Sequence, residues 1–294
     1  MKYHLIECVK QMKLRLLNRI INNRSLLSLC FVITKLIPCK KTYLYEYLSI
    51  VGVNRKSLLH NIAKNRFLCS CGLVRELIFS TAKFHTNPSE ILSTFKLSPE
   101  TKEAIDESEV ILMVHPCDRI KLIMGLVDSI STQRIVIPVY GDITDYQTYT
   151  EKNFDKFVVY VNTANPDAIS IITREVSRGS KLLIFADLPS RKMWVTFGKT
   201  KQVTLFDKVA HMPYGPFLLA SKFASKVAFV AAKEDFNQMS LIHESLNSAS
   251  LSVLMKGFIQ FYEAFITNHT ESVLYLSRLP TYHYHPTSPA DIRL

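Results

Sequence analysis

Glycine is scarce in this sequence, and the motifs that depend on it are missing. Only 8 of the 294 residues are glycine, and the chain has no Gly-rich phosphate loop, no internal repeat and no low-complexity tract. This scarcity argues against a nucleotide-binding fold built on such a loop. A bilayer-spanning run is missing too, because the apolar stretch from Leu26 to Pro38 contains Ser28, Thr34 and Lys35 and falls short of the roughly 20 residues required.

Signals for export and for metal binding are also missing. The segment from Met1 to Leu17 has no apolar core and no small-residue cleavage site, so we predict no secretory signal and expect a cytoplasmic protein. The cysteines, at positions 8, 30, 39, 69, 71 and 117, lack the paired two-residue spacing of zinc sites. Cys69-Ser70-Cys71 alone is a weak metal or redox signal. We therefore expect reduced, structural thiols, no metal site and no bound cofactor.

The net positive charge of the chain comes entirely from its first quarter. Residues 1–66 hold 13 Lys and Arg against two acids, Glu7 and Glu46, whereas residues 67–294 hold 23 charges of each sign. Such a basic segment can face anionic lipid headgroups, nucleic acid or an acidic protein partner.

Apolar spacing within this basic segment narrows the choice of partner. Between residues 5 and 21, apolar side chains recur three and four positions apart among basic ones, which predicts a basic amphipathic helix. We therefore expect residues 1–66 to be a helical segment that contacts the inner face of the cell membrane, with no nucleic acid as partner. The alternative is that these helices pack on the body and only display their lysines.

Strands alternate with helices from residue 108 onward, whereas residues 1–107 indicate successive helices without a convincing strand. Short apolar runs rich in β-branched residues predict strands at Val110–Val114, Ile135–Val139, Phe157–Val161, Leu182–Phe185 and Val227–Val230. Helical spacing predicts helices at Arg119–Ile130, Asp167–Val176 and Asn237–Ile266. We predict an α/β domain at residues 67–278, with a mostly parallel central sheet flanked by helices, and a proline-containing tail at 279–294.

Polar residues at the ends of these strands are the candidates for chemistry, since ligands of such sheets bind beyond the carboxyl ends of the strands. They are His115, Tyr140-Gly141-Asp142, Asn162, Asp187 and Glu234-Asp235. An imidazole at the first of these ends can take up a proton near neutral pH, and a nearby carboxylate can orient it. Asp118 is the first acid after His115. His-x-x-Asp alone fits equally a histidine that is only held by backbone contacts.

Six segments between residues 55 and 235 share their order and spacing with one known family. They are Arg55–Asn61, Gly72–Glu76, the apolar strand with its histidine at Glu107–His115, the glycine-strand-aspartate segment Ser177–Asp187, the Phe-Gly segment Val195–Lys199 and the small-residue stretch Gly215–Ala220. Together they resemble the lipid A biosynthesis acyltransferase family, relatives of the glycerolipid and lysophospholipid acyltransferases.

The resemblance implies an acyltransferase in which His115 removes a proton from a hydroxyl or amine of a lipid or hydrophobic metabolite. The acceptor then attacks the thioester of an acyl carrier protein or of coenzyme A. Asp187 and Arg191 would line the acyl or acceptor site, or alternatively form a surface salt bridge. Backbone N–H groups near Gly198 and Lys199 would stabilise the oxyanion.

Two departures from the family pattern bear on the mechanism. The family places an acid five residues after the histidine, where this chain has Ile120. Either Asp118 replaces that acid and orients His115, or the charge relay is lost and the protein binds a lipid or an acyl carrier without catalysis. The family's central arginine motif also has no clear counterpart between Tyr140 and Asn165.

Two further motifs are interpreted as structural. Cys117 could act as a thiol nucleophile, but neighbouring loop residues rarely point at one another, and a buried cysteine is the simpler interpretation. His283 and His285 could bind a metal, but alternate residues of an extended segment point to opposite sides.

Overall fold

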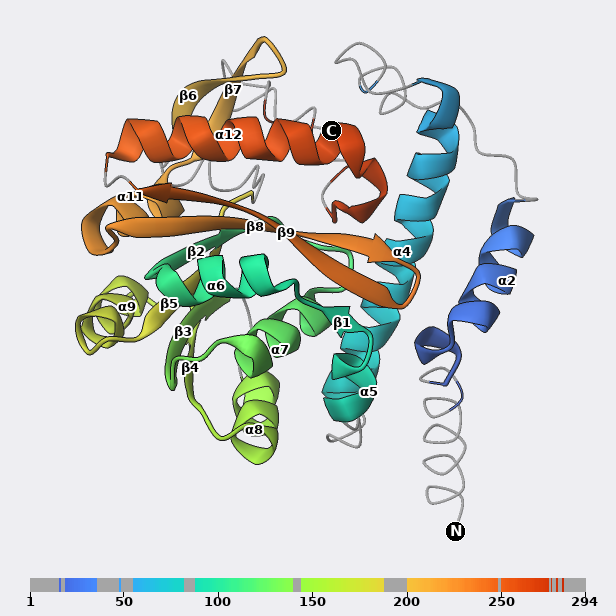
Figure 1. Cartoon of the computed structure of the whole chain (residues 1–294), viewed down its shortest axis with the longest axis horizontal. Coiled ribbons are helices and arrows are strands. Elements are labelled where there is room, and N and C mark those ends of the chain that lie inside the picture. Colours follow the sequence, from blue (N-terminus) through green and yellow to red (C-terminus); the bar gives the residue numbers. More distant parts are fainter. Residues whose placement is uncertain are drawn as a thin grey trace.

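The structure is a computed structural model that describes residues 16, 19–35, 48, 55–81, 88–139, 144–187, 200–247, 250–274, 276, 279 and 282. Within these residues the chain forms an α/β fold preceded by helices (Figure 1). The strands are β1 (Phe95–Lys96), β2 (Val110–Met113), β3 (Arg134–Val139), β4 (Phe157–Asn162), β5 (Lys181–Phe185), β6 (Thr200–Leu205), β7 (Lys208–Pro213), β8 (Lys226–Asp235) and β9 (Gln238–Asn247). The helices are α2 (Arg24–Lys35), α4 (Arg55–Thr81), α5 (Pro88–Leu92), α6 (Pro99–Glu107), α7 (Arg119–Ser129), α8 (Thr144–Asn153), α9 (Ala168–Ser177), α11 (Gly215–Phe223) and α12 (Leu251–Asn268).

The described strands form a seven-stranded, mostly parallel sheet in the order β1-β9-β8-β2-β5-β3-β4. β2 lies at its centre, between β8 and β5, and is parallel to both. Among the described strand pairs of this sheet, only β8–β9 is antiparallel. The five strands expected from apolar runs and the helices expected at Arg119–Ile130 and Asp167–Val176 are confirmed, and with them the predicted fold class.

Side-chain alternation along the strands divides the core into two layers. Val110 and Leu112 of β2 point into one apolar cluster, which contains buried residues of α9, α11 and α12. Ile111 and Met113 point into the other, which contains buried residues of α6, α7 and α8. All residues of β2 are buried, as expected for a central strand covered on both faces. Figure 1 shows α12 on one side of the sheet and α6 and α7 on the other.

The prediction of a helix over Asn237–Ile266 is wrong in its first half. β9 occupies Gln238–Asn247 and pairs with β8, and only then does α12 begin, capped by the Ser250 hydroxyl, which accepts from the Val253 N–H. The sequence hides this hairpin because its turn contains no glycine. Phe236 instead adopts the left-handed conformation, with a φ of 53°.

A second hairpin, β6–β7, was not anticipated from the sequence. Its turn residues Phe206 and Asp207 both have positive φ, at 51° and 58°, the conformation that hairpin turns usually assign to Asn-Gly. The Phe206 N–H donates to the Glu263 carboxylate of α12. The hairpin is therefore bonded to the helix that covers the sheet.

α4 joins the basic segment to the α/β body. It runs without interruption through residue 66, so the boundary predicted between residues 66 and 67 falls inside one helix. Leu58 and Ile62 near its start belong to the first apolar cluster, and Phe79 near its end belongs to the second. α4 thus packs along the edge of both core layers. Most of the basic amphipathic helix expected between residues 5 and 21 lies outside the described residues.

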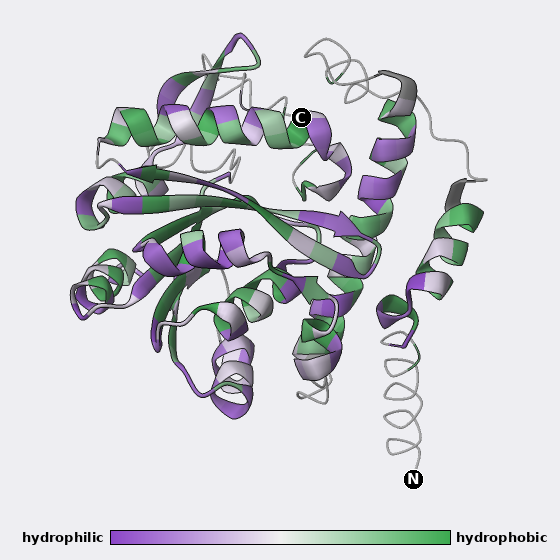
Figure 2. Ribbon diagram, in the orientation of Figure 1, coloured by the Kyte–Doolittle hydropathy of each residue, from purple (hydrophilic) through white to green (hydrophobic). Residues whose placement is uncertain are grey.

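α2 packs against α4 through one face only. Leu27 and Phe31 are buried, whereas Leu26, Leu29 and Ile33 are exposed. Figure 2 shows hydrophobic residues on this outlying helix as well as in the central strands. Of the helices that the structure describes, none has the length and hydropathy needed to cross a bilayer.

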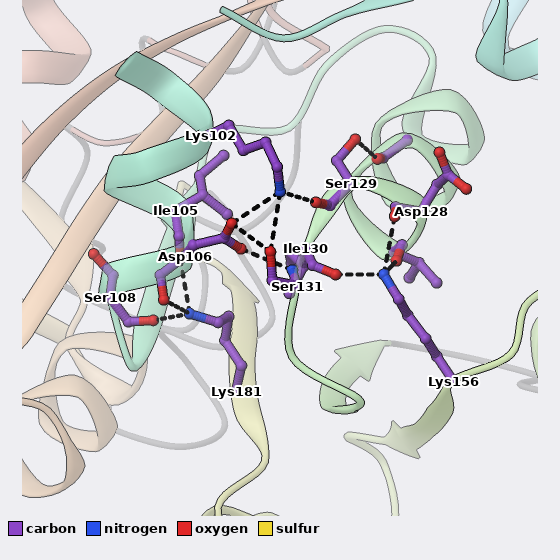
Figure 3. A network of polar contacts seen from close by, with 12 residues as sticks. Lys102, Ile105, Asp106, Ser108, Asp128, Ser129, Ile130, Ser131, Lys156 and Lys181 are labelled. Carbon is purple, nitrogen blue, oxygen red and sulfur yellow. Dashed lines mark hydrogen bonds and ion pairs between the residues drawn. The ribbon is translucent and has the colours of Figure 1, made fainter. Parts of the chain in front are cut away.

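Lysine side chains stabilise the end of the sheet where β5 begins (Figure 3). The Lys181 ammonium donates to the carbonyls of Ile105 and Asp106 at the end of α6, at 2.7 and 3.0 Å. Lys156 likewise donates to the carbonyl of Val127 at the end of α7, at 2.6 Å. The last carbonyls of a helix lack intrahelical donors and carry partial negative charge, so these ammonium groups satisfy them. This polar end lies opposite the carboxyl ends of β2 and β5.

Candidate active site

His115 and Asp187 come together because of the register of two neighbouring strands. β2 and β5 are parallel, and Met113 pairs with Phe185 at their carboxyl ends. The chain continues in the same direction on both strands, and the Ala186 N–H still donates to the Met113 carbonyl at 2.9 Å. Two residues beyond the last pair, His115 and Asp187 therefore face each other.

The Asp187 carboxylate holds both the ring and the backbone of His115. The ring Nδ1 lies 2.6 Å from Asp187 Oδ1, and the His115 backbone N–H donates to both carboxylate oxygens at 3.0 Å. An ionised carboxylate can only accept, so Nδ1 carries the proton of this bond. In the neutral ring Nε2 is then the unprotonated nitrogen, and it is the atom that can take a proton from a substrate. The geometry is that of a histidine–aspartate dyad.

The dyad is deeply buried and packed against aromatic rings. His115 is 4% exposed and Asp187 0%. The imidazole stacks on Phe185, the last residue of β5, with ring centroids 3.9 Å apart. The Tyr282 hydroxyl donates to the Asp187 backbone carbonyl at 2.8 Å, and the Leu274 N–H donates to the His115 carbonyl at 3.1 Å. The predicted tail at 279–294 thus contributes a buried residue to this site.

Asp118 does not hold His115 in the structure, in contrast to the sequence-based assignment. One of its oxygens accepts from the Lys121 N–H at 3.1 Å and so caps the start of α7. The other pairs with Nε of Arg75 at 2.5 Å, and both partners are buried. The carboxylate expected from Asp118 beside the imidazole is supplied by Asp187, because Asp118 is turned toward α4. Sequence reasoning placed Asp187 only in the substrate site.

A fully buried acid lies behind the loop that follows His115. Glu234, near the end of β8, accepts from the backbone N–H of Cys117 at 2.6 Å and of Asp118 at 3.3 Å. Burial raises the pKa of Glu234 to about 8, and the negative charge of Asp118 acts in the same direction. The carboxyl group therefore fixes the loop backbone and is largely protonated near neutral pH.

Lys121 is a second buried basic residue of this cluster, beside Arg75. Its ammonium donates to the Asn237 carbonyl in the β8–β9 turn. Burial lowers the pKa of Lys121 to about 8, although Asp118 and Glu234 oppose the shift. Arg75 belongs to the same cluster through its ion pair with Asp118. Its guanidinium also donates to the Asn22 side chain at 3.0 Å. The residues around Asp118 are thus a buried polar cluster that joins α4, α7 and the β8–β9 turn.

The remaining predicted site residues fall into two groups. Ile120, at the position of the family acid, is 1% exposed and packs in the second apolar cluster. Arg191, Gly198 and Lys199 lie outside the described residues, as do residues 140–143, His283 and His285. In the part of the chain that the structure describes, no three His, Cys, Asp or Glu side chains are grouped so as to hold a metal ion.

Sequence reasoning missed the roles of Arg75, Glu234 and Tyr282. A usable signal existed for the dyad, because His115 and Asp187 both directly follow predicted strands. What was missing was the order of the strands in the sheet. Nothing in the local sequence indicated that Arg75 would be the partner of Asp118.

Comparison with known proteins does not identify a function for this site. No protein-family model matches the chain, and no curated protein matches it in sequence. The function must therefore be inferred from the site itself and from the ordered resemblance noted above.

Proposed function

We propose that this protein is an acyltransferase that moves an acyl chain from an acyl-carrier-protein or coenzyme A thioester to a hydroxyl or amine of a lipid or hydrophobic metabolite. The observation that carries the proposal is the His115–Asp187 dyad, with 2.6 Å between Nδ1 and Oδ1, at the carboxyl ends of two parallel strands. That edge is where sheets of this kind bind their ligands. The proposal retains the family resemblance but replaces Asp118 with Asp187 as the acid.

In the proposed reaction His115 acts first as a base and then as an acid. Nε2 accepts the proton of the acceptor hydroxyl or amine while its oxygen or nitrogen attacks the thioester carbonyl. The resulting tetrahedral intermediate expels the thiolate, which takes the proton from the imidazolium. Asp187 holds the ring by Nδ1 and stabilises its positive charge in between.

We assign substrate contacts to the segment that follows Asp187. It contains Arg191, Gly198 and Lys199. The positive charges of Arg191 and Lys199, and the backbone N–H groups near Gly198 and Lys199, suit the thioester and the oxyanion that forms during attack. The acyl thioester is a co-substrate, so the proposal requires no bound cofactor and no metal.

Membrane attachment is part of the proposal. The net charge of residues 1–66 suits the anionic inner face of the cell membrane and also an acidic carrier protein. Leu26, Leu29 and Ile33 of α2 add exposed apolar side chains, at 42%, 58% and 56%. A basic segment with exposed apolar residues is typical of proteins that lie on a bilayer surface.

Two observations favour a second candidate, a catalytically inactive relative that binds a lipid or an acyl carrier. The imidazole of His115 is 4% exposed, and the acid of the family motif is replaced by a core residue, Ile120. A dyad that an acceptor never reaches would only stabilise the junction of β2 and β5. We favour the enzyme because the carboxylate partner, which the motif lacks, is supplied by Asp187.

Acyl transfer can be tested with the purified chain. It is incubated with acyl-coenzyme A or acyl carrier protein thioesters and with dispersed lipids that carry a free hydroxyl or amine, and acylated product is measured by mass spectrometry. We expect product with the wild type and a loss of about 10³-fold or more with His115→Ala. His243→Ala is the control, since it removes a half-buried histidine whose Nδ1 lies 2.9 Å from the Thr101 hydroxyl. Equal turnover by His115→Ala would exclude the mechanism, and no transfer by the wild type would favour the inactive binder.

A further inference from the structure

Two cysteines that are far apart in the sequence have their sulfur atoms in contact. Cys69 lies in α4, and Cys117 lies in the loop two residues after His115. Their Sγ atoms are 3.3 Å apart. Asn65, one turn before Cys69 in α4, has its amide nitrogen 3.6 Å from the Cys117 sulfur and its amide oxygen 3.9 Å from the Cys69 sulfur. A side chain that contacts both sulfurs therefore holds the pair in position.

Gly72 explains why the helix and the loop are so close. A Cβ atom built on Gly72 would lie 1.9 Å from the Cys117 carbonyl oxygen. Only a residue without a side chain allows this approach, and the two backbones are thus in direct contact at the site of the sulfur pair. A disulfide has an S–S bond of about 2.05 Å, so the two sulfurs, now 3.3 Å apart, must move closer together for the bond to form.

The two thiols differ in exposure and in acidity. Cys69 is partly exposed, whereas Cys117 is 4% exposed. The hydrogen bond from Cys117 lowers the pKa of the Cys69 thiol, while burial raises the pKa of the Cys117 thiol. Cys71, on the same helix, differs from both because burial raises the pKa of its thiol to about 12. Thiolates and not thiols attack disulfides, so we expect Cys69, the more exposed thiol and the one whose pKa is lowered, to attack first.

We propose that Cys69 and Cys117 form a thiol–disulfide exchange site for low-molecular-weight disulfides of the glutathione type. The Cys69 thiolate attacks one sulfur of the small disulfide, a mixed disulfide forms, and the first small thiolate leaves. Cys117 then gives up its proton and attacks the Cys69 sulfur as a thiolate, the bond from Cys69 to the small molecule breaks, and the leaving thiolate takes up that proton and departs as the second small thiol. In total two protein thiols are oxidised and one small disulfide is reduced to two thiols.

The bond would link α4 covalently to the loop that carries His115 and Asp118. The backbone N–H groups of Cys117 and Asp118 bind Glu234, and Arg75 of α4 pairs with Asp118. Oxidation therefore acts on a loop that begins at the dyad histidine and whose Asp118 belongs to the buried polar cluster. The exchange itself requires no acyl transfer, so the site stands independently of the proposed function.

The exchange is tested on the full chain with glutathione disulfide as the probe, followed by alkylation, trypsin digestion without reduction and mass spectrometry. The Cys71→Ser variant is used alongside the wild type, because residues 67–75 form one tryptic peptide that contains both Cys69 and Cys71. We expect this peptide to become linked to residues 103–119, which contain Cys117, and the link to disappear with dithiothreitol.

Single substitutions separate the two steps. In Cys117→Ala the reaction is expected to stop at a mixed disulfide of glutathione with Cys69. Cys69→Ala is expected to form neither this mixed disulfide nor the 69–117 link. Circular dichroism confirms that each variant is folded. The proposal is overturned if the folded wild type and Cys71→Ser form no 69–117 link at any glutathione disulfide concentration. It is equally overturned if Cys71 in the wild type reacts as readily as Cys69.

Discussion

Arg75 and Asp118 form an ion pair with the same 2.5 Å separation as Arg24 and Asp235, but in a different environment. The side chains of the first pair are 3% and 12% exposed, and those of the second are 53% and 37%. Removing one partner from a buried pair leaves a charge without solvent or counter-ion, whereas an exposed charge is solvated by water.

The two pairs therefore predict different costs for the same substitution. Arg75→Met should lower the free energy of unfolding by about 3–5 kcal/mol. Arg24→Met should change it by no more than about 1 kcal/mol. Urea denaturation of both variants measures the difference. Equal effects of the two substitutions would show that the buried pair does not tie α4 to α7.

Glu234 predicts a defined dependence of stability on pH. Its pKa is raised from 4.5 to about 8 in the folded state, so the unfolded chain releases the proton more easily. The stability associated with the protonated group is complete below pH 4.5 and is lost as the pH rises toward 8. Glu234→Gln keeps an acceptor for the Cys117 N–H but cannot ionise.

The stability of Glu234→Gln relative to the wild type should therefore increase between pH 5 and pH 8, by on the order of a few kcal/mol. Denaturant titrations at several pH values within this window measure it. The window stays below pH 8 because Lys121, with its pKa lowered to about 8, contributes a change of opposite slope above that value. Parallel stability curves for the two proteins would contradict the assignment.

Gly72 predicts a steric effect at the contact between α4 and the Cys117 loop. Alanine is the better helix former, so propensity alone favours Gly72→Ala by up to about 1 kcal/mol. The 1.9 Å approach to a backbone oxygen outweighs this, and we expect a loss of about 3 kcal/mol, the upper end for overpacking. Gly215→Ala, where a new Cβ meets nothing within 4 Å, should stay within about 0.5 kcal/mol of the wild type. Thermal unfolding that ranks the two variants in the opposite order would refute the close contact.

The dyad predicts which ring nitrogen of His115 carries the proton. Because Nδ1 donates to Asp187, the neutral imidazole should be the Nδ1–H form, whereas free histidine prefers Nε2–H. Nitrogen-15 NMR of histidine-labelled protein distinguishes the two forms, with His115→Gln identifying the signal. A proton on Nε2 in the neutral wild type would contradict the hydrogen bond from His115 Nδ1 to Asp187.

The parts of the fold that local pattern determines could be predicted from the sequence. The runs that became β2, β3, β5 and β8 are apolar throughout, because both faces of a central strand are covered, and the run that became the edge strand β4 is apolar as well. β9 could not be found in this way. It lies toward one side of the sheet, only Met239 and Leu241 of its residues are buried, and its polar half has no alternation to detect.

The sequence indicated both members of the dyad as site residues, but not that they pair with each other. His115 and Asp187 were both recognised at strand ends, yet Asp118 was chosen as the partner because it is near in sequence. Which carboxylate reaches the imidazole depends on β5 being the neighbour of β2, a contact across 72 residues that no local pattern reports. Asp118 is occupied by Arg75, whose burial in α4 follows from how the helix packs.

The rate of acyl transfer by Asp187→Asn, compared with Asp118→Asn under conditions where both are folded, tests the central claim most directly. Asparagine keeps the shape of the side chain but cannot stabilise the imidazolium, so Asp187→Asn should lower the rate by about 10²- to 10⁴-fold. Asp118→Asn should weaken folding and leave the rate of the folded protein within about tenfold of the wild type. Wild-type turnover by Asp187→Asn, together with a large loss in Asp118→Asn, would contradict the dyad described here.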